Sequence, residues 1–256
     1  MEYWVSKLRE QAAHIINGDC STEPQAFNRA PAGMAELSHD LEKLARIVAE
    51  REVSRKALAH EVHHRVKNNL QIITSLLNMQ ASRIENPAAR EALGQTRARI
   101  GALALIHRIL YDQDDDGGQA TIDVALLISE LCALFRLWNK DRWEIAFSCH
   151  ADPLAVPLDS AMPLALFAVE AITNAYAYAF PKGRSGTVIL RFDLDGAGAA
   201  CLSVADNGTG FDSMANDQSM GRQLMLGFAR QLSGSLAIHS TAASGTEVRL
   251  DYCPGI

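Results

Sequence analysis

The feature that most restricts how this chain can fold is an apolar stripe that continues for about fifty residues without an internal glycine or proline. Its members, which we call the apolar seam, are Leu37, Leu41, Leu44, Val48, Leu58, Val62, Val66, Leu70, Ile73 and Leu77. They follow helical spacing, so we predict a single helix that is too long to stand alone in a globular domain. The seam therefore requires a covering partner.

A second helical pattern follows, and Asn86-Pro87 separates it from the first. Its apolar positions are Leu93, Ile100, Leu103, Leu105, Ile106 and Leu110. The two patterns together predict a helical hairpin. Two such hairpins in a homodimer would form a four-helix bundle that covers the seam.

The C-terminal half has a different pattern, and the acidic, glycine-containing stretch Asp112 to Gly118 marks the boundary. Beyond it we predict helices at 124–138, 160–179 and 221–232, and strands around 143–147, 188–194, 202–204 and 248–252. The predicted fold of this half is an α+β two-layer sandwich, with helices on one side of a largely antiparallel sheet.

Charge and cysteine usage exclude several classes of protein. The chain has 24 Lys and Arg against 30 Asp and Glu, a net charge of −6, which argues against a nucleic-acid binder. Its five cysteines are widely spread and lack zinc-site spacing, so we expect reduced thiols. No apolar run is long enough for a membrane span, and no basic region precedes an apolar run at the N-terminus. We expect a cytoplasmic protein.

The densest group of chemically active side chains lies within the long predicted helix. One polar face carries His60, His64, Lys67, Asn68 and Gln71. A neutral imidazole there can attack an electrophilic phosphorus if an acceptor holds the proton of its other nitrogen, and Glu61 precedes His64 by three residues. Spacing alone favours a solvated, histidine-rich helix face, because helix periodicity does not require any chemistry.

A second candidate site is the loop Asp206 to Phe211, which follows a predicted strand. Gly208 and Gly210 would permit a tight turn with positive φ and a close approach of the backbone to a ligand. Asp206 offers a carboxylate to a donor such as an exocyclic amine. An ordinary turn at the end of a strand has the same composition.

Two helical segments complete the candidates. Glu170 and Asn174 lie one turn apart, so the Asn oxygen can bind a hard cation that bridges phosphates while Glu170 orients water or the metal shell. Neighbouring backbone can cap the same side chains instead. Gly221 stands at a predicted helix start, where free N–H groups favour phosphate, although glycine is frequent at such positions.

In this order, the segments resemble the bacterial histidine kinases, in the branch with an H-H-R-V-K-N-N-L-Q box that is related to the HWE kinases. His63 to Gln71 resembles the phosphoacceptor box, and Ala102 to Tyr111 resembles the second dimerisation helix. The other motifs are similar to the N box (Glu170 to Phe180), the two glycine boxes (Asp206 to Phe211 and Ser219 to Leu224) and the closing strand motif (Gly245 to Glu247) of a GHKL-type ATP-binding domain. The resemblance covers about residues 52–253.

The resemblance implies a role for each matched residue. His64 would be phosphorylated, with His63 as the competing choice, and Asn68 would orient a water for dephosphorylation. Asp206 would bind the adenine amine of ATP, and Asn174 the Mg²⁺ ion. The remaining implied nucleotide-binding residues are Glu170, Gly208, Gly210, Gly221, Arg222 and Thr246, around a lid at about 212–220.

The implied protein is a protein-histidine kinase of a two-component system. ATP would phosphorylate the histidine, which would pass the phosphate to an aspartate of a response-regulator receiver domain. The expected divisions are an N-terminal helical or linker segment of unknown role (1–50), a dimerisation and phosphotransfer hairpin (51–112), an acidic linker (113–118) and a catalytic ATP-binding domain (119–256).

Three departures from the family pattern keep alternatives open. Ala177 stands where a basic residue is usual, Arg222 stands where an apolar residue is usual, and the lid is short. Loss of a cation should weaken ATP binding or slow transfer, unless Arg222 or Lys182 supplies the charge. The alternatives are a histidine phosphotransfer or phosphatase protein with a degenerate ATP site, and a non-enzymatic dimeric binding scaffold.

Overall fold

The computed structural model describes residues 2–16, 31–81, 83–112, 121–139, 142, 144–181, 184–196, 198–211, 219–242 and 244–254. The predicted acidic linker and most of the predicted lid lie outside these residues. The chain divides into two compact units, Met1–Arg65 and Val66–Ile256. The first contains α1 (Glu2–Ile16) and the beginning of α2 (Ala32–Ala81).

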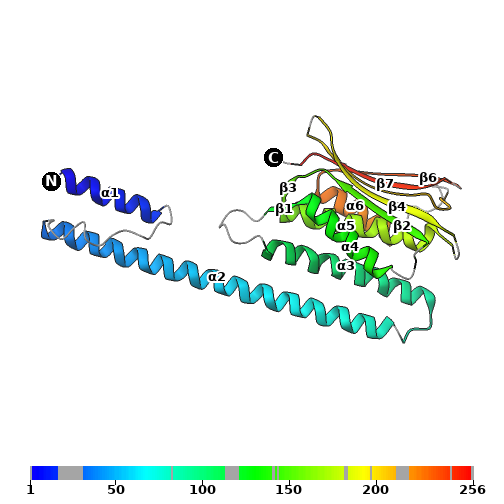
Figure 1. Ribbon diagram of the computed structural model, residues 1–256, viewed down its shortest axis with the longest axis horizontal. Helices are drawn as coiled ribbons and strands as arrows, with labels where there is room; N and C mark the ends of the chain where they lie inside the picture. Colours follow the sequence, from blue (N-terminus) through cyan, green and yellow to red (C-terminus); the bar gives the residue numbers. More distant parts are fainter. Residues whose placement is uncertain are drawn as a thin grey trace. The chain divides into compact units, whose positions relative to one another are not determined.

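The prediction of one long helix is confirmed, because α2 is 50 residues long and has no break (Figure 1). Several side chains of the apolar seam are exposed along it, namely Leu37, Leu44, Val48, Leu58 and Ile73. Exposed leucines repeated along one helix are a feature of a surface that another chain covers.

Helix α3 (Pro87–Asp112) begins at the predicted Asn86-Pro87 break. The Asn86 side-chain oxygen accepts a hydrogen bond from the Ala89 N–H at 3.4 Å, which satisfies one of the free N–H groups of the first turn. Further along α3, one face is buried in the same apolar core as the following helices and strands, and its residues are Ala98, Ala102, Leu105, Ile106 and Ile109. Helix α3 is therefore packed onto the C-terminal sandwich.

The sandwich contains a five-stranded sheet in the order β2-β4-β5-β7-β6. The strands are β2 (Ile145–Ala151), β4 (Gly186–Leu194), β5 (Ala200–Asp206), β6 (Ser235–Thr241) and β7 (Gly245–Tyr252). Strands β2 and β4 are parallel and the other pairs are antiparallel, as the prediction of a largely antiparallel sheet requires. A separate two-stranded sheet joins β1 (Thr121–Asp123) to β3 (Ala155–Pro157).

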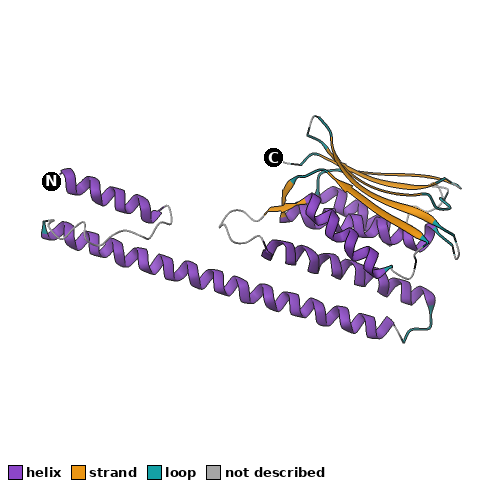
Figure 2. Cartoon of the chain, in the orientation of Figure 1, coloured by secondary structure: helices purple, strands orange, loops and turns teal. Residues whose placement is uncertain are grey.

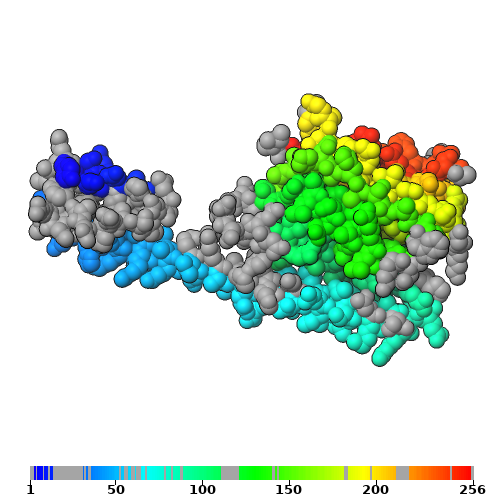
Figure 3. Space-filling model, in the orientation of Figure 1, coloured from blue at the N-terminus to red at the C-terminus, as the bar shows by residue number. Residues whose placement is uncertain are grey.

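One face of the large sheet is covered by α4 (Val124–Trp138), α5 (Leu158–Asn174) and α6 (Met220–Gln231) (Figure 2). The space-filling view shows α3 and α4 in contact on the surface of this unit (Figure 3). The core between the layers is apolar and includes Phe135, Phe167, Phe192, Leu202 and Leu250, all almost completely buried. The two-layer α+β prediction is confirmed.

The predicted helix at 160–179 differs from the structure in its last turn. After α5 ends, the chain continues as a π-helix, η2 (Ala175–Ala179). The wider turn is held by Arg142, whose guanidinium donates to the carbonyl oxygens of Tyr176 at 2.7 Å and Phe180 at 2.9 Å. Single π-turns of this kind occur preferentially at functional sites.

Candidate functional site

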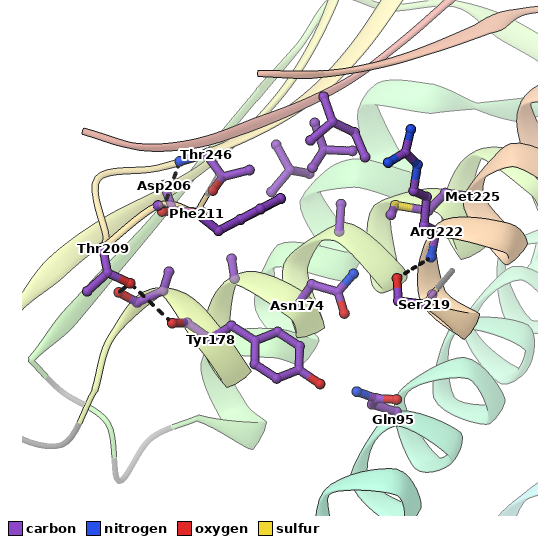
Figure 4. A pocket seen from close by; sticks show the side chains of 18 of the residues that line it. Gln95, Asn174, Tyr178, Asp206, Thr209, Phe211, Ser219, Arg222, Met225 and Thr246 are labelled. Atoms are coloured by element: carbon purple, nitrogen blue, oxygen red, sulfur yellow. Dashed lines mark hydrogen bonds between the residues drawn. The ribbon is translucent and has the colours of Figure 1, made fainter. Parts of the chain in front are cut away.

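A pocket of about 540 Å³ opens between the helical layer and one end of the sheet (Figure 4). Its wall contains six of the residues proposed from the sequence: Asn174, Asp206, Gly210, Gly221, Arg222 and Thr246. Apolar side chains of Val204, Met225, Ile238 and Val248 form another part of the wall. Its volume and mixed lining suit a small organic ligand with a few polar groups.

Asp206 is the last residue of β5, and the sheet register sets it opposite Thr246 of β7. Its Oδ1 accepts hydrogen bonds from the backbone N–H of Gly208 at 2.9 Å and of Thr246 at 3.2 Å. Burial raises the pKa of the Asp206 carboxyl, although the two N–H donors act in the opposite direction. Because both bonds described for this carboxylate end on Oδ1, Oδ2 can accept from a ligand.

The loop after Asp206 is held close to η2. The Thr209 N–H donates to the carbonyl oxygen of Ala179 at 2.9 Å, and a Cβ on Gly208 would lie only 2.3 Å from that oxygen. Gly210 has the expected positive φ, +60°, but Gly208 is not among the residues with positive φ. The expectation of positive φ at Gly208 was therefore wrong, and glycine is required there by the close approach of two backbone segments.

Asn174 lies at the end of α5, directly beside the start of α6. A Cβ on Gly221 would lie 3.2 Å from Asn174 Nδ2 and 3.7 Å from Glu170 Oε2, so these three residues meet at one point. Ser219 caps α6 by accepting from the Arg222 N–H at 3.4 Å. Met220 and Gly221, the first two residues of α6, line the pocket, so their N–H groups lie at a favourable position for phosphate.

Glu170 and Gly208 do not belong to the pocket wall. Glu170 is buried behind it, with a side chain 2% exposed, and its carboxylate forms an ion pair with Arg99 of α3. Arg99 was not among the residues proposed from the sequence. Gln95 and Tyr178, which line the pocket, were not proposed either. The available signal was Glu170 itself, since a carboxylate on an apolar helix requires a cation.

The residues proposed on the long helix are only partly described. The backbone of His60, His63 and His64 is helical in α2, but their side chains lie outside the described part of the chain. Glu61 accepts a hydrogen bond from Arg65 Nε at 2.7 Å. The proposed contact between Glu61 and His64 therefore stays a prediction.

The donor set in the pocket fits Mg²⁺ bound together with a nucleotide. The described residues contain no group of three or more His, Cys, Asp or Glu side chains that could hold a metal ion. The Asn174 amide oxygen in the pocket wall is a hard oxygen donor, and Mg²⁺ usually combines one or two such donors with phosphate oxygens and water. Both oxygens of the neighbouring Glu170 accept from Arg99, so this carboxylate would act on the water shell of the ion rather than as a direct ligand. Among the described helices, none combines the length and apolarity needed to cross a membrane.

A mixed-sheet sandwich with this pocket, preceded by a long helix that carries a histidine-rich box, defines the core of a histidine kinase. Residues 61–138 match the family model "Histidine kinase", and residues 144–252 match "Histidine kinase-like ATPase domain". The chain belongs to the histidine kinases, in the HWE-related branch that its motifs resemble.

Solved and curated proteins agree with this assignment. The histidine kinase domain of a blue-light-activated histidine kinase from Erythrobacter litoralis is similar over 75% of this chain and 91% of its own, with a TM-score of 0.56 and 25% identity. "Sensor histidine kinase PdtaS" of Mycobacterium tuberculosis is 31% identical over 204 residues, which are 77% of this chain. "Blue-light-activated histidine kinase 2" of Erythrobacter litoralis is 28% identical over 75% of this chain. The chain spans 40% of the length of PdtaS and 55% of the blue-light kinase.

Proposed function

We propose that the chain is the catalytic core of a two-component histidine kinase, which transfers the γ-phosphoryl group of ATP to His64 and then to an aspartate of a response-regulator receiver domain. The observation that carries this proposal is the pocket. It gathers the side chains of three separate motifs, Asn174, Asp206 and Arg222, around one cavity.

The pocket offers complementary contacts to the two ends of ATP. Asp206 Oδ2 can accept from the adenine amine, and the apolar wall that includes Val248 and Met225 suits the base. The start of α6 supplies N–H groups for the phosphates, and Arg222 brings a cation to the same wall. This cation supports the idea that Arg222 replaces the basic residue absent at Ala177.

The transfer step breaks the bond between the γ-phosphorus and the ADP oxygen and forms a bond between that phosphorus and a ring nitrogen of His64. The proton on the other ring nitrogen passes to an acceptor, for which Glu61 is our candidate. Mg²⁺, held through Asn174, supplies charge neutralisation on the phosphates when it is bound. Asn68, exposed one turn after His64, is our candidate for orienting water during dephosphorylation.

Incubation with ATP labelled in the γ-phosphate tests the proposal. We expect an acid-labile phosphohistidine on the unaltered chain and on His60→Ala, which is the matched control one turn earlier, and no label on His64→Ala. The phosphorylated chain should then lose its label to a receiver domain. If the label disappears in His63→Ala and persists in His64→Ala, the phosphate acceptor is His63.

Absence of label from a chain that binds nucleotide would contradict the kinase proposal and favour the phosphotransfer or phosphatase alternative. Absence of both label and Mg²⁺-dependent nucleotide binding would favour the scaffold. Labelling and a nucleotide-binding measurement together separate the three possibilities that the sequence left open.

A further inference from the structure

The ion pair between Arg99 and Glu170 joins helix α3 to the helix that carries Asn174. Arg99 Nε donates to one carboxylate oxygen of Glu170, and its Nη2 donates to the other at 3.0 Å. This two-bond arrangement fixes both the position and the orientation of the carboxylate. The hydrogen bond to Glu170 raises the pKa of Arg99, so the guanidinium remains charged.

Burial makes this partner essential to Glu170. The Glu170 side chain is 2% exposed, whereas that of Arg99 is 25% exposed. A buried carboxylate without a compensating cation is strongly unfavourable, because it has lost its hydration and no ion pair or hydrogen bond replaces it. Glu170 can remain an oriented anion behind the pocket only while α3 is packed against α5.

Other residues of α3 touch the same pocket. Gln95 is part of its wall, and the Tyr178 phenol, which lies opposite in Figure 4, interacts with Glu91 and Gln95. Burial, followed by the hydrogen bond with Glu91, raises the pKa of Tyr178. Glu91, Gln95 and Arg99 are spaced four residues apart, so they form one polar row along α3.

We propose that Arg99 is a positioning residue of the nucleotide site: it holds the Glu170 carboxylate beside Asn174 and thereby sets the strength of Mg²⁺–nucleotide binding. This inference rests on the proposed function. It adds that α3, which lies in the region matching the histidine kinase model, completes the nucleotide site of the ATPase domain. Movement of α3 away from α5 would weaken that site.

Titration with a fluorescent ATP analogue, with Mg²⁺ and with EDTA, tests the proposal. We expect Arg99→Ala to weaken binding about tenfold in Mg²⁺ and to change it less than twofold in EDTA, because Arg99 acts through a metal-orienting carboxylate. Arg99→Lys keeps the charge but not the two-bond geometry. Its affinity in Mg²⁺ should therefore lie between those of the unaltered chain and Arg99→Ala. Arg108→Ala is the matched control, since it removes another ion pair of α3, with Glu130, that is not in the pocket wall.

A double-mutant cycle separates this role from a purely structural one. If Arg99 acts only through Glu170, the pair Arg99→Ala/Glu170→Gln should bind no more weakly than Glu170→Gln alone. Thermal unfolding of the nucleotide-free proteins should show that Glu170→Gln restores stability lost in Arg99→Ala. If Arg99→Ala does not fold, Arg99→Lys and the double variant still provide the comparison.

Unchanged or tighter binding by Arg99→Ala, equal losses in Mg²⁺ and EDTA, or additive losses in the cycle would overturn the proposal. A chain that binds the analogue but forms no phosphohistidine would refute the proposed function and leave this inference standing. A chain that binds no nucleotide would refute both.

Discussion

At the scale of single residues, Asp206 offers a substitution that changes the chemistry of the site while keeping the shape of the side chain. In Asp206→Asn the amide oxygen can still accept from the Gly208 and Thr246 N–H groups, but an NH₂ replaces the oxygen available to adenine. A hydrogen bond to a charged group contributes about 1.5–3 kcal/mol, so nucleotide affinity should fall roughly ten- to a hundredfold. Isothermal titration measures the loss.

Asp193→Asn is the matched control for this change, because Asp193 pairs with the exposed Arg191 and is not part of the pocket wall. It should leave affinity within about twofold of the unaltered chain. Nearly equal melting temperatures for Asp206→Asn and the unaltered chain would show that the backbone bonds persist. Equal affinity for adenine and guanine nucleotides in the unaltered chain would contradict the role given to Asp206.

The sequence predicted those site residues that belong to contiguous motifs. Asp206 and Gly210 follow one strand, and Gly221 begins one helix, so local patterns contained their positions. Arg99 could not be found this way, because it is 71 residues from Glu170 and only tertiary packing brings the two together. Similarly, the need for glycine at position 208 depends on a neighbouring segment rather than on its own turn.

At the scale of elements, the π-helix η2 affects both the stability of the fold and the affinity for nucleotide. Arg142 donates to the carbonyl groups of Tyr176 in η2 and of Phe180 directly after it. The residues of η2 in the pocket wall are Ala175, Tyr178 and Ala179. Arg142→Ala should lower the melting temperature by about 4–10 °C, from the loss of charged hydrogen bonds worth about 1.5–3 kcal/mol. It should also weaken nucleotide binding at least fivefold, measured by the same titration.

Arg136→Ala provides the comparison for this element. Arg136 also donates to a backbone carbonyl, that of Phe147 at 3.0 Å, but neither residue lines the pocket. A similar loss of melting temperature without a loss of affinity is therefore expected. If Arg142→Ala and Arg136→Ala lose affinity equally, the loss results from lower overall stability, and η2 has no separate role in binding.

Element boundaries show which parts of the fold a pattern can specify. The long helix and the break at Asn86-Pro87 were predicted correctly because spacing and proline act locally. The change from α5 to η2 was not, because Ala175 to Ala179 continues an apolar run that fits either pitch. The wider turn depends on Arg142, which lies more than thirty residues earlier in the chain.

At the scale of the whole molecule, the exposed apolar seam of α2 predicts association. Leu44 and Val48 are 56% and 45% exposed, and burying the exposed half of each side chain in a bundle releases roughly 0.7–1.5 kcal/mol. We expect a dimer in sedimentation equilibrium, shifted to monomer by Leu44→Glu/Val48→Glu. Arg46→Glu, which changes charge on the opposite face of the same helix, should remain dimeric.

The oligomeric state also bears on the chemistry. A dimeric bundle would cover the seam while leaving the polar face with His64 accessible, because the two sets of residues lie on different sides of one helix. The monomeric Leu44→Glu/Val48→Glu variant should therefore keep its nucleotide affinity, since the pocket is built from residues of the second unit alone. Its rate of phosphohistidine formation then reports whether transfer occurs within one chain: a rate per chain that is independent of dilution indicates transfer in cis. A monomer that binds nucleotide normally but forms no phosphohistidine would show that the seam is part of the catalytic assembly.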